Sequence, residues 1–400
     1  MRLALIIDDY LPHSTRVGAK MFHELALELI KSGHKVTVIT PAIGQALNFV
    51  EESIDNVNVW RFRSGPIKDV SKINRALNET LLSFRAWRAI KHKVKRDSFD
   101  GIIYYSPSIF FGGLVAKIKQ HCLCPSYLVL RDLFPQWIVD AGMIKAGSLI
   151  ERYFRFFEHY SYRQADVIGL MSEKNVEVFC QANGQRYSTE VLRNWAALTP
   201  YISRDVSSTL RHKLGLEGKI LYFYGGNIGH AQDMANLMRL AKSMCDYEKA
   251  HFLFVGQGDE VELINEMAME WQLENYTYLP SVNQDEFKAI LADIDVGLFS
   301  LSAQHTAHNF PGKLLGYMLQ SLPILGSVNP GNDLLELINS HNAGFITVNG
   351  NDEEFLNNAI RIYKDSELRA QLGLNAYYLL ENEFAISSIA QNILEGLRRQ

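Results

Sequence analysis

Residues 220–232 read ILYFYGGNIGHAQ, in which an apolar run passes into a glycine-rich turn and then into a helical pattern. Gly225, Gly226 and Gly229 allow a close backbone approach and positive φ angles. We expect the helix that opens near His230 to direct unpaired N–H groups and a positive dipole end at whatever lies in the turn. The expected ligand is an anion, most simply a nucleotide diphosphate, although a strand-to-helix turn that binds nothing fits this segment equally well.

The first strand of the chain lacks the signature of a dinucleotide-binding turn. It covers residues 2–7, and the loop after it contains a single glycine, Gly18, with no G-x-G-x-x-G pattern. A nicotinamide-dependent dehydrogenase is therefore disfavoured. The next residues indicate a helix over 17–31 and a buried strand over 36–40, which together open a βαβ unit.

The strand-then-helix pattern runs through residues 1–193, is interrupted by a linker at 194–205 and resumes over 206–384. Strands are expected near 2–7, 35–40, 57–62, 101–105, 126–130, 166–171 and 189–192, and again near 220–224, 251–255, 276–279, 295–299, 322–326 and 344–347. The fold class is α/β, with two Rossmann-like doubly wound domains facing across a cleft. Because ligands bind at the carboxyl ends of such strands, we expect Gly18 on one side of the cleft and the glycine turn on the other.

The composition is that of a soluble α/β enzyme, with 47% hydrophobic and 21% charged residues. We expect no segment that spans a bilayer, and Asp8 and Asp9 interrupt the N-terminus before a signal peptide could form. The 4 cysteines form neither a disulfide framework nor a zinc ribbon, so a reducing cytoplasm is the expected compartment. Cys122 and Cys124 could bind a metal with His121, but a strand-edge position explains them better.

Positive charge gathers in the first half of the chain. Residues 1–200 hold 26 Lys/Arg and 19 Asp/Glu, whereas residues 201–400 hold 14 and 25. The segment 84–96, FRAWRAIKHKVKR, interleaves basic and aromatic residues, and 153–163 adds an aromatic helix. Such helices suit an anionic membrane surface, although a solvated helix face with a buried aromatic side fits as well. Nucleic acid is a weaker option because the overall balance is acidic.

A second constellation lies at 309–326, NFPGKLLGYMLQSLPILG, where a turn starts a helix with Lys313 in its first turn. A lysine at a helix N-terminus opposes the helix dipole unless an anion is bound between them. Lys313 is therefore a candidate diphosphate ligand, the alternative being a lysine that extends into water. His305 and His308 just upstream could form a metal pair, but no third ligand is evident and a loop position beside a nucleotide is favoured.

Six motifs in order carry a family resemblance. They are GHKVTVIT at 33–40, RDLFPQW at 131–137, LRNW at 192–195, YGGNIGHAQD at 224–233, FVGQGDE at 254–260 and FPGKLLGYMLQSLPILG at 310–326. Together they resemble the retaining glycosyltransferases of family 4, which have two Rossmann domains (the GT-B fold), and they cover nearly the whole chain. The chain looks most similar to the bacterial branch that adds N-acetyl-fucosamine or related sugars during O-antigen and capsule assembly.

This resemblance implies a hexosyltransferase-type enzyme that moves a sugar, with retention, from a nucleotide-sugar to a lipid-linked, undecaprenyl-type glycan in lipopolysaccharide or capsule synthesis. UDP is the implied nucleotide, and an N-acetylated deoxyhexose is a candidate sugar. The N-terminal domain would hold the acceptor and the C-terminal domain the donor, while residues 385–400 would form a helix that crosses back to the N-terminal domain. The enzyme would lie in the cytoplasm, on the inner face of the membrane through 84–96, and would need no cofactor.

The chain departs from the resembled family at positions that usually bind the donor. A glutamate pair of the family corresponds here to His308 and Gly316, and the Arg and Lys that flank the phosphate turn correspond to Asn227 and Gln232. Positive charge for the leaving diphosphate would then have to come from elsewhere, with Lys313, Arg193 and the helix N-terminus as the visible sources.

Asp132 follows the strand at 126–130, so we expect it to contact the acceptor or the donor sugar; a helix cap before Leu133 is the alternative. No D-x-D pair is placed to hold a divalent ion, and the mechanism is expected to be independent of metal. The turn amides and the Lys313 ammonium would stabilise the diphosphate as the sugar passes through an oxocarbenium-like state. The candidate residues are Asp132 and Lys313 for catalysis, with Gly18, Arg193, Asn194, Gly226, Asn227, Gly229, Gln232, Gly256, Asn309 and Lys313 for the nucleotide-sugar.

Two other functions stay open. A nucleotide-sugar epimerase also uses a cleft between two Rossmann domains, and conversion of a UDP-sugar without any acceptor would favour it. A degenerate, non-catalytic partner subunit would show the same losses at the donor-binding positions, and failure to bind any nucleotide would support it.

Overall fold

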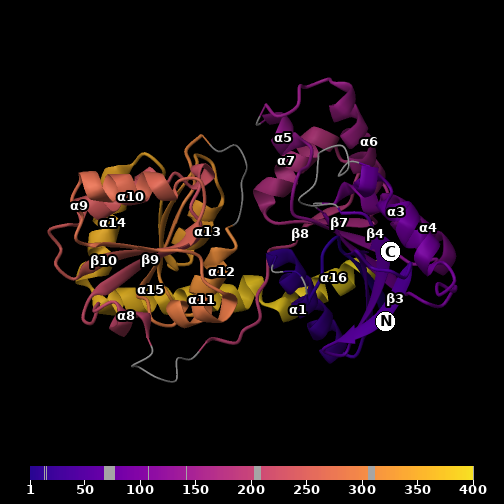
Figure 1. Cartoon of the computed structure of the whole chain (residues 1–400), viewed down its shortest axis with the longest axis horizontal. Coiled ribbons are helices and arrows are strands. Elements are labelled where there is room, and N and C mark those ends of the chain that lie inside the picture. The colour runs from indigo at the N-terminus through magenta and orange to yellow at the C-terminus, as the bar shows by residue number, and fades with distance from the viewer. Residues whose placement is uncertain are drawn as a thin grey trace. The chain divides into compact units, whose positions relative to one another are not determined.

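The computed structural model describes residues 1–12, 14, 16–66, 77–106, 108–140, 142–201, 209–304 and 311–399. The chain forms two compact α/β units (Figure 1). The N-terminal unit contains Met1–Trp195 and Ile386–Gln400, and the C-terminal unit contains Ala196–Ala385. Each unit is built around one largely parallel sheet with helices on its faces. The prediction of two Rossmann-like halves is confirmed.

The sheet of the N-terminal unit has the strand order β3-β4-β2-β1-β5-β6-β7-β8. Its strands are β1 (Arg2–Ile6), β2 (Lys35–Ile43), β3 (Phe49–Ile54), β4 (Val57–Ser64), β5 (Gly101–Ser106), β6 (Ser126–Leu130), β7 (Val167–Leu170) and β8 (Thr189–Val191). The paired strands run parallel except for β3 and β4, which form an antiparallel hairpin that turns at Asp55 and Asn56. The sequence pattern does not predict β3, because this edge strand reads FVEESI and lacks a buried apolar face.

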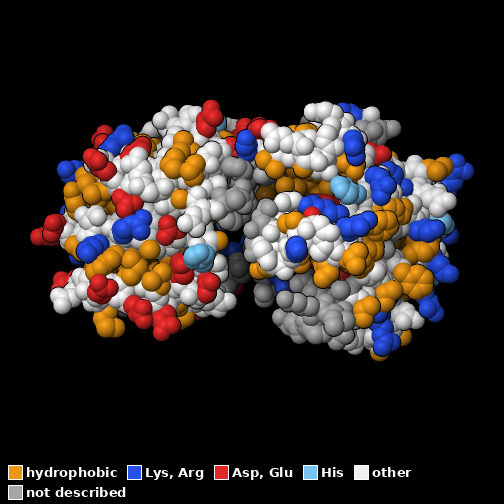
Figure 2. Space-filling model, turned by 90° about the horizontal axis from the view of Figure 1, so that it is seen from above, with side chains coloured by type: hydrophobic (Ala, Val, Ile, Leu, Met, Phe, Trp, Pro, Cys, Tyr) orange, Lys and Arg blue, Asp and Glu red, His pale blue; other side chains and the backbone are white. Residues whose placement is uncertain are grey.

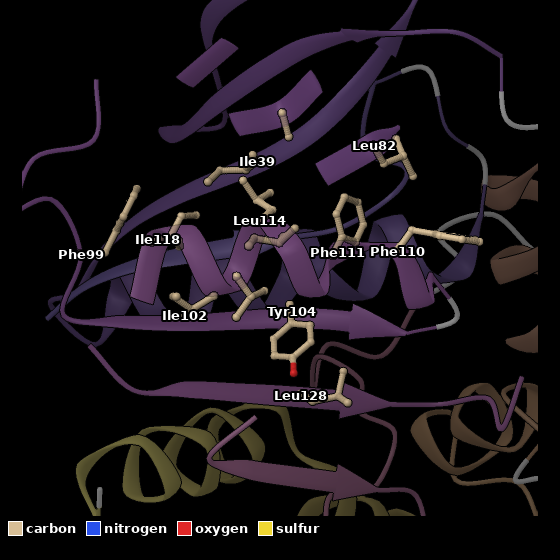
Figure 3. Close-up of a cluster of buried hydrophobic side chains, with 14 of the residues drawn as sticks. Ile39, Leu82, Phe99, Ile102, Tyr104, Phe110, Phe111, Leu114, Ile118 and Leu128 are labelled. Atoms are coloured by element: carbon tan, nitrogen blue, oxygen red, sulfur yellow. The ribbon is translucent and has the colours of Figure 1, made fainter. Parts of the chain in front are cut away.

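One face of this sheet is covered by α3 (Leu82–Ile90), α4 (Gly112–Cys122), α6 (Leu149–Tyr162) and the short helical turn η1 (Ile109–Phe111). Figure 3 shows the apolar core between them and the sheet, in which Leu114 and Ile118 of α4 lie over Ile102 and Tyr104 of β5. The hydroxyl of the buried Tyr104 donates to the Ser161 carbonyl at 2.7 Å, so the polar end of the ring is also satisfied. Two further helices, α5 (Gln136–Asp140) and α7 (Glu173–Asn183), complete the unit.

The opposite face is covered by α1 (Val17–Lys31) and by the last helix of the chain, α16 (Ile386–Arg398). The two helices contact each other, and α16 also contacts β6. Ile389, Ile393 and Leu397 of α16 are buried in one cluster with Leu5 and Leu25. The final helix therefore completes the core of the N-terminal unit, although it lies about 190 residues away in the chain from β8.

Ile393 provides a test of this packing. Because its side chain is fully buried, Ile393→Ala should destabilise the N-terminal unit by about 2–5 kcal/mol through lost apolar contact and a cavity. Urea unfolding followed by tryptophan fluorescence measures the change. Asn392→Ala, at the exposed neighbouring position, is the control and should change stability by less than about 0.5 kcal/mol. Equal effects of the two substitutions would contradict the packing.

The sheet of the C-terminal unit has the strand order β11-β10-β9-β12-β13-β14, and its paired strands are all parallel. Its strands are β9 (Ile220–Asn227), β10 (Ala250–Gln257), β11 (Tyr276–Leu279), β12 (Val296–Ser300), β13 (Ile324–Val328) and β14 (Gly344–Val348). This is the Rossmann order, in which the chain direction across the sheet reverses beside the first strand, and ligands bind there at the carboxyl ends of the strands. The fold therefore points to the end of β9.

The sheet of the C-terminal unit is covered by helices on both faces. They are α8 (Leu210–Lys213), α9 (Met234–Ser243), α10 (Val261–Glu270), α11 (Gln284–Leu291), α12 (Lys313–Leu319), α13 (Leu334–Ser340), α14 (Asp352–Lys364) and α15 (Ser366–Leu379), followed by the π-helical turn η4 (Leu380–Phe384). The chain enters this unit at Ala196 and leaves it at Ala385, and these two residues form a parallel β-bridge. Residues 202–205 of the predicted linker lie outside the described residues.

No helix among the residues that the structure describes is long and apolar enough to cross a membrane. In the same part of the chain, no group of three His, Cys, Asp or Glu side chains is placed to hold a metal ion. The buried Cys122 donates its thiol to the Lys95 carbonyl at 3.3 Å, and His121 packs against the Trp87 ring. His305 and His308, the other metal pair considered, lie outside the described residues.

Candidate active site

The end of β9 approaches the end of β10 unusually closely. Gly226 pairs with Gly256 across the two strands, and a Cβ atom on Gly256 would lie 1.8 Å from the Gly226 carbonyl oxygen. Gly226 itself has a φ of 120°, which side-chain-bearing residues rarely adopt. Both positions therefore require glycine, as the sequence predicts for a turn that lets the backbone approach a ligand.

The predicted donor-binding residues of the turn lie together. The Asn227 side-chain amide donates to Gln232 Oε1 at 2.8 Å. Gly229 packs beneath this pair, since a Cβ atom there would lie 2.6 Å from Asn227 Nδ2 and 2.8 Å from Asp259 Oδ1. Gly229 has extended backbone with negative φ, so it is needed for space and not for a positive φ. The two side chains that replace the charged pair of the resembled family therefore bind each other.

The helix after the turn begins later than the sequence suggests. Residues His230–Gln232 form one turn of 3-10 helix, and α9 begins only at Met234. The first amide of α9, on Met234, donates to the Glu260 carboxylate at 3.1 Å. A helical turn thus opens at His230 as predicted, but the first amide of α9 is bound by Glu260 and is not free for a ligand.

Lys313 reaches the glycine turn from the start of α12. Its Nζ atom lies 3.4 Å from the centroid of the Tyr224 ring, and a Cβ atom on Gly226 would lie 3.8 Å from Nζ. The side chain is half-buried, and desolvation lowers the pKa of Lys313 well below its usual value. Within the described residues, no carboxylate and no hydrogen-bond acceptor contacts this ammonium. A desolvated cation without a neighbouring anion is unfavourable in free energy. The position of Lys313 is therefore a candidate binding site for an anion.

Tyr317 fixes α12 against the sheet. It lies one helical turn after Lys313, and its buried hydroxyl lies 3.0 Å from the Leu298 carbonyl oxygen and 3.4 Å from the Gly225 amide nitrogen. These contacts hold the helix that carries Lys313 at the ends of β9 and β12. Tyr317 and Tyr224 are not among the residues predicted from the sequence, although the four-residue spacing from Lys313 places Tyr317 on the same helix face.

A second polar cluster lies at the carboxyl ends of β1, β5 and β6 in the N-terminal unit. Gly18 lies against Tyr105 of β5, because a Cβ atom on Gly18 would lie 3.1 Å from the Tyr105 hydroxyl oxygen. Burial raises the pKa of Tyr105 to about 12, with a smaller opposing effect of Arg131 and smaller additions from Asp8 and Asp132. The structure therefore brings Gly18 and Asp132 to one edge of this sheet, around a tyrosine that the sequence analysis did not select.

Asp132 is half-buried and lies two residues after β6. The alternative that it caps a helix before Leu133 is wrong, since the next helix, α5, begins at Gln136. Its neighbour Arg131 has a structural position. The guanidinium donates to the carbonyls of Leu192 and Arg193 at 2.5 and 3.0 Å and lies over the Trp195 ring, and burial lowers its pKa to about 10.

The remaining predicted residues are distributed as follows. Arg193 forms an ion pair with Glu173 at 3.0 Å in the N-terminal unit, so its charge already has a partner. Asn194 is half-buried beside it.

Gly316 lies inside α12, where a Cβ atom would approach Leu291 to 3.0 Å, so a larger residue would need Leu291 to shift. Asn309 and His308 lie outside the described residues.

The C-terminal unit combines a Rossmann sheet with a glycine turn and a lysine that has no anionic partner among the described residues, which are the features expected of a domain that binds nucleotide-type anions. Residues 206–378 match the family described as Glycosyl transferases group 1. This region includes the whole of the glycine turn, Gly256 and Lys313. The similarity to this family thus covers most of the C-terminal unit and less than half of the chain.

Comparisons over a longer part of the chain agree. WbjE of Pseudomonas aeruginosa, which is named as a glycosyltransferase, is 25% identical over 54% of this chain and 54% of its own length. WcaI of Escherichia coli K12, which is named as a colanic acid biosynthesis glycosyl transferase, is 23% identical over 73% of this chain and 74% of its own length. The chain thus spans about half the length of the first relative and three quarters of the second.

The fold is that of solved GT-B glycosyltransferases. HepE of Anabaena, solved in complex with UDP and glucose, superposes with a TM-score of 0.68 at 17% identity, over 100% of both chains. At this identity the likeness concerns the fold. The GT-B fold class expected from the six motifs is confirmed.

Proposed function

We propose that this protein is a glycosyltransferase that moves a sugar, with retention, from a UDP-linked donor to a lipid-linked glycan during synthesis of a bacterial surface polysaccharide. The observation that carries the proposal is the desolvated Lys313 ammonium beside Gly226, which has no anionic partner among the described residues. A diphosphate at the glycine turn would supply that partner. The names of WbjE and WcaI support the activity, and the UDP bound to HepE supports the donor class.

The chemistry assigned to the C-terminal unit is stabilisation of the leaving diphosphate. As the bond to the sugar lengthens, negative charge grows on the diphosphate oxygen, and donors already aimed at that charge lower the barrier. Asn227 and Gln232 carry no charge and bind each other. In the turn, Lys313 therefore supplies the positive charge. The Ile228 amide already donates to the Gln257 carbonyl at 2.9 Å, so the neutral donors would come from the other backbone amides between Gly226 and Gly229.

The N-terminal unit is assigned to the acceptor. Asp132, Tyr105 and Gly18 lie at one edge of its sheet, where a carboxylate could orient an attacking hydroxyl group. Gly18 leaves room there, since any side chain would press on Tyr105. An N-acetylated deoxyhexose stays the candidate donor sugar, and the anomer formed in the reaction, measured by NMR, tests retention.

Nucleotide binding should not require a metal ion. Calorimetric titration of the protein with UDP, GDP and dTDP in the presence of EDTA is expected to give micromolar binding for one of them, with UDP first. We base this expectation on Lys313 and the turn amides, which would bind the diphosphate without a metal ion. Binding that appears only after Mg²⁺ or Mn²⁺ is added would overturn the metal-independent mechanism, and no binding of any nucleotide would favour a non-catalytic partner subunit. Conversion of a UDP-sugar without an acceptor would favour an epimerase.

Peripheral attachment to the inner face of the cytoplasmic membrane belongs to the same proposal. Figure 2 shows Lys and Arg side chains next to hydrophobic patches on the N-terminal unit, at the right of the view. Within the predicted segment 84–96 the helix α3 ends at Ile90, and Trp87 packs on His121, so Phe84 is the exposed aromatic residue. The segment therefore offers one aromatic anchor among basic residues, and flotation with anionic vesicles tests the attachment.

A further inference from the structure

The N-terminal unit contains a second candidate site, a pocket between the end of β4 and the helix α3. Its volume is about 740 Å³. The walls are formed by the residues that follow β2, including Gln45, by Ser64 and Gly65 at the end of β4, and by α3. The pocket therefore opens at the carboxyl edge of the sheet, where ligands of parallel sheets bind.

Three arginines, Arg63, Arg85 and Arg88, line this pocket, and none of its described lining residues is acidic. Among the described residues, neither Arg63 nor Arg88 forms an ion pair or a side-chain hydrogen bond. This differs from Arg61, two residues before Arg63 on the same strand, which pairs with Glu52. A cluster of arginines without counter-charges attracts an anion, and phosphate groups match the guanidinium geometry.

One of the three arginines is held in a defined position. Arg85 donates to Asn78 Oδ1 at 3.0 Å, and the Asn78 amide group donates to the Pro66 carbonyl at 2.9 Å. This arrangement needs Gly65, because a Cβ atom there would lie 2.2 Å from Asn78 Oδ1. The half-buried Arg85 is thus fixed in the pocket wall before any ligand arrives.

The rim of the pocket is apolar. Leu81 and Phe84 line it, and they are 40% and 63% exposed. Exposed side chains of this size next to unpaired arginines suit a molecule that joins an anionic group to a hydrocarbon chain. A sugar phosphate alone would leave this rim uncovered, and a neutral lipid would leave the arginines unpaired.

We propose that this pocket binds the diphosphate end of the lipid-linked acceptor, with the first part of its hydrocarbon chain on Leu81 and Phe84. The proposal rests on the proposed glycosyltransferase function. β2 is separated from β6, which precedes Asp132, by β1 and β5, a distance of roughly 14 Å at about 4.8 Å per strand. The pocket and Asp132 would therefore contact opposite ends of one elongated acceptor.

The test uses farnesyl diphosphate as a soluble probe, with inorganic pyrophosphate and farnesol as its two halves. Calorimetry on the full-length protein should give an affinity for farnesyl diphosphate at least tenfold above that for either half. The double substitution Arg63→Gln, Arg88→Gln should weaken that affinity at least tenfold. Phe84→Ala should weaken binding of farnesyl diphosphate but not of pyrophosphate. The matched control is Lys91→Gln, Arg96→Gln, which removes two exposed charges from the same segment outside the pocket and should leave the affinity for farnesyl diphosphate unchanged.

The remaining outcomes distinguish a failure of the pocket assignment from a failure of the proposed function. If wild type binds UDP but not farnesyl diphosphate, the pocket assignment fails while the proposed function stands; if it binds neither, the proposed function fails. If the arginine variant binds farnesyl diphosphate normally but loses binding to vesicles containing phosphatidylglycerol, the pocket is a headgroup site of the membrane, and the assignment is overturned. Because these substitutions lie in the N-terminal unit and UDP is assigned to the C-terminal unit, urea unfolding followed by tryptophan fluorescence, unchanged from wild type, shows that the variants are folded.

Discussion

Lys313→Ala is expected to abolish measurable UDP binding and to lower turnover by about 10²–10³-fold, the loss typical of one donor that stabilises charge in the transition state. The reason is local. Lys313 is the cation that reaches Gly226, and the turn residues Asn227 and Gln232 carry no charge that could replace it. Calorimetry with UDP and steady-state kinetics with a UDP-sugar measure the two effects.

Two control variants separate this effect from a general change of charge. Lys249→Ala removes an exposed lysine of the same unit and should leave UDP affinity unchanged. Lys313→Met keeps an unbranched side chain over the Tyr224 ring, where its sulfur can contact the aromatic face. Nucleotide binding in Lys313→Met comparable to wild type would remove Lys313 from the site.

The stability of the Lys313→Met variant gives an independent readout. Because desolvation lowers the pKa of Lys313 in the folded protein, the unfolded chain binds more protons than the folded one between the lowered pKa and the usual value near 10.4. The lowered pKa thus destabilises the ligand-free protein, most strongly below the lowered pKa, and this contribution becomes less unfavourable as the pH rises toward the usual value. Lys313→Met should therefore raise the unfolding free energy by about 0.5–2 kcal/mol while it removes binding.

The same pKa shift predicts how binding depends on pH. A bound diphosphate favours the charged ammonium and raises the pKa of Lys313, so UDP binding should be accompanied by proton uptake and should weaken as the pH rises through the lowered pKa. Titrations in two buffers of different ionisation enthalpy measure the protons taken up. Equal apparent enthalpies in both buffers would show that Lys313 does not change its protonation state on binding.

The features that the sequence predicts are those with a local signature. An apolar run followed by Gly225 and Gly226 predicts the strand and the turn because the glycine requirement is set within a few residues, and the structure shows it as the close approach to Gly256. Lys313 could be selected because its place at a helix start is visible in the chain. The apolar spacing of the final helix likewise predicts its buried side, Ile389 and Ile393.

The features that the sequence does not reveal depend on partners far away in the chain. Glu260 binds the first amide of α9 from a different βα connection, so this amide is not free for a ligand. Arg193 is paired by Glu173, which no spacing rule indicates. Tyr105 becomes part of the cluster with Gly18 only because β5 pairs with β1. Long-range contacts of this kind decide which candidate charges remain available for a ligand.

Asp132→Asn is the second substitution with a large expected effect. If the carboxylate orients the acceptor hydroxyl group and accepts its proton, turnover should fall by about 10²–10⁴-fold. UDP affinity should not change, because the donor diphosphate is assigned to the C-terminal unit. The substitution keeps the shape of the side chain and removes its charge, and no helix begins directly after Asp132 that the side chain could cap.

The kinetics of the Asp132→Asn variant distinguish a role of Asp132 in the reaction from a position beside Tyr105 without such a role. A catalytic or orienting carboxylate predicts a lower kcat at saturating acceptor, with unfolding free energy within about 1 kcal/mol of wild type. Asp97→Asn is the matched control, since Asp97 is an exposed carboxylate of the same unit whose printed ion pair with Arg2 is long, at 3.6 Å. Since Asp132 adds to the raised pKa of Tyr105, its replacement should also lower the pKa of that phenol, which ultraviolet titration can follow. Full turnover together with a shifted tyrosine titration would leave Asp132 as a neighbour of Tyr105 with no part in the reaction.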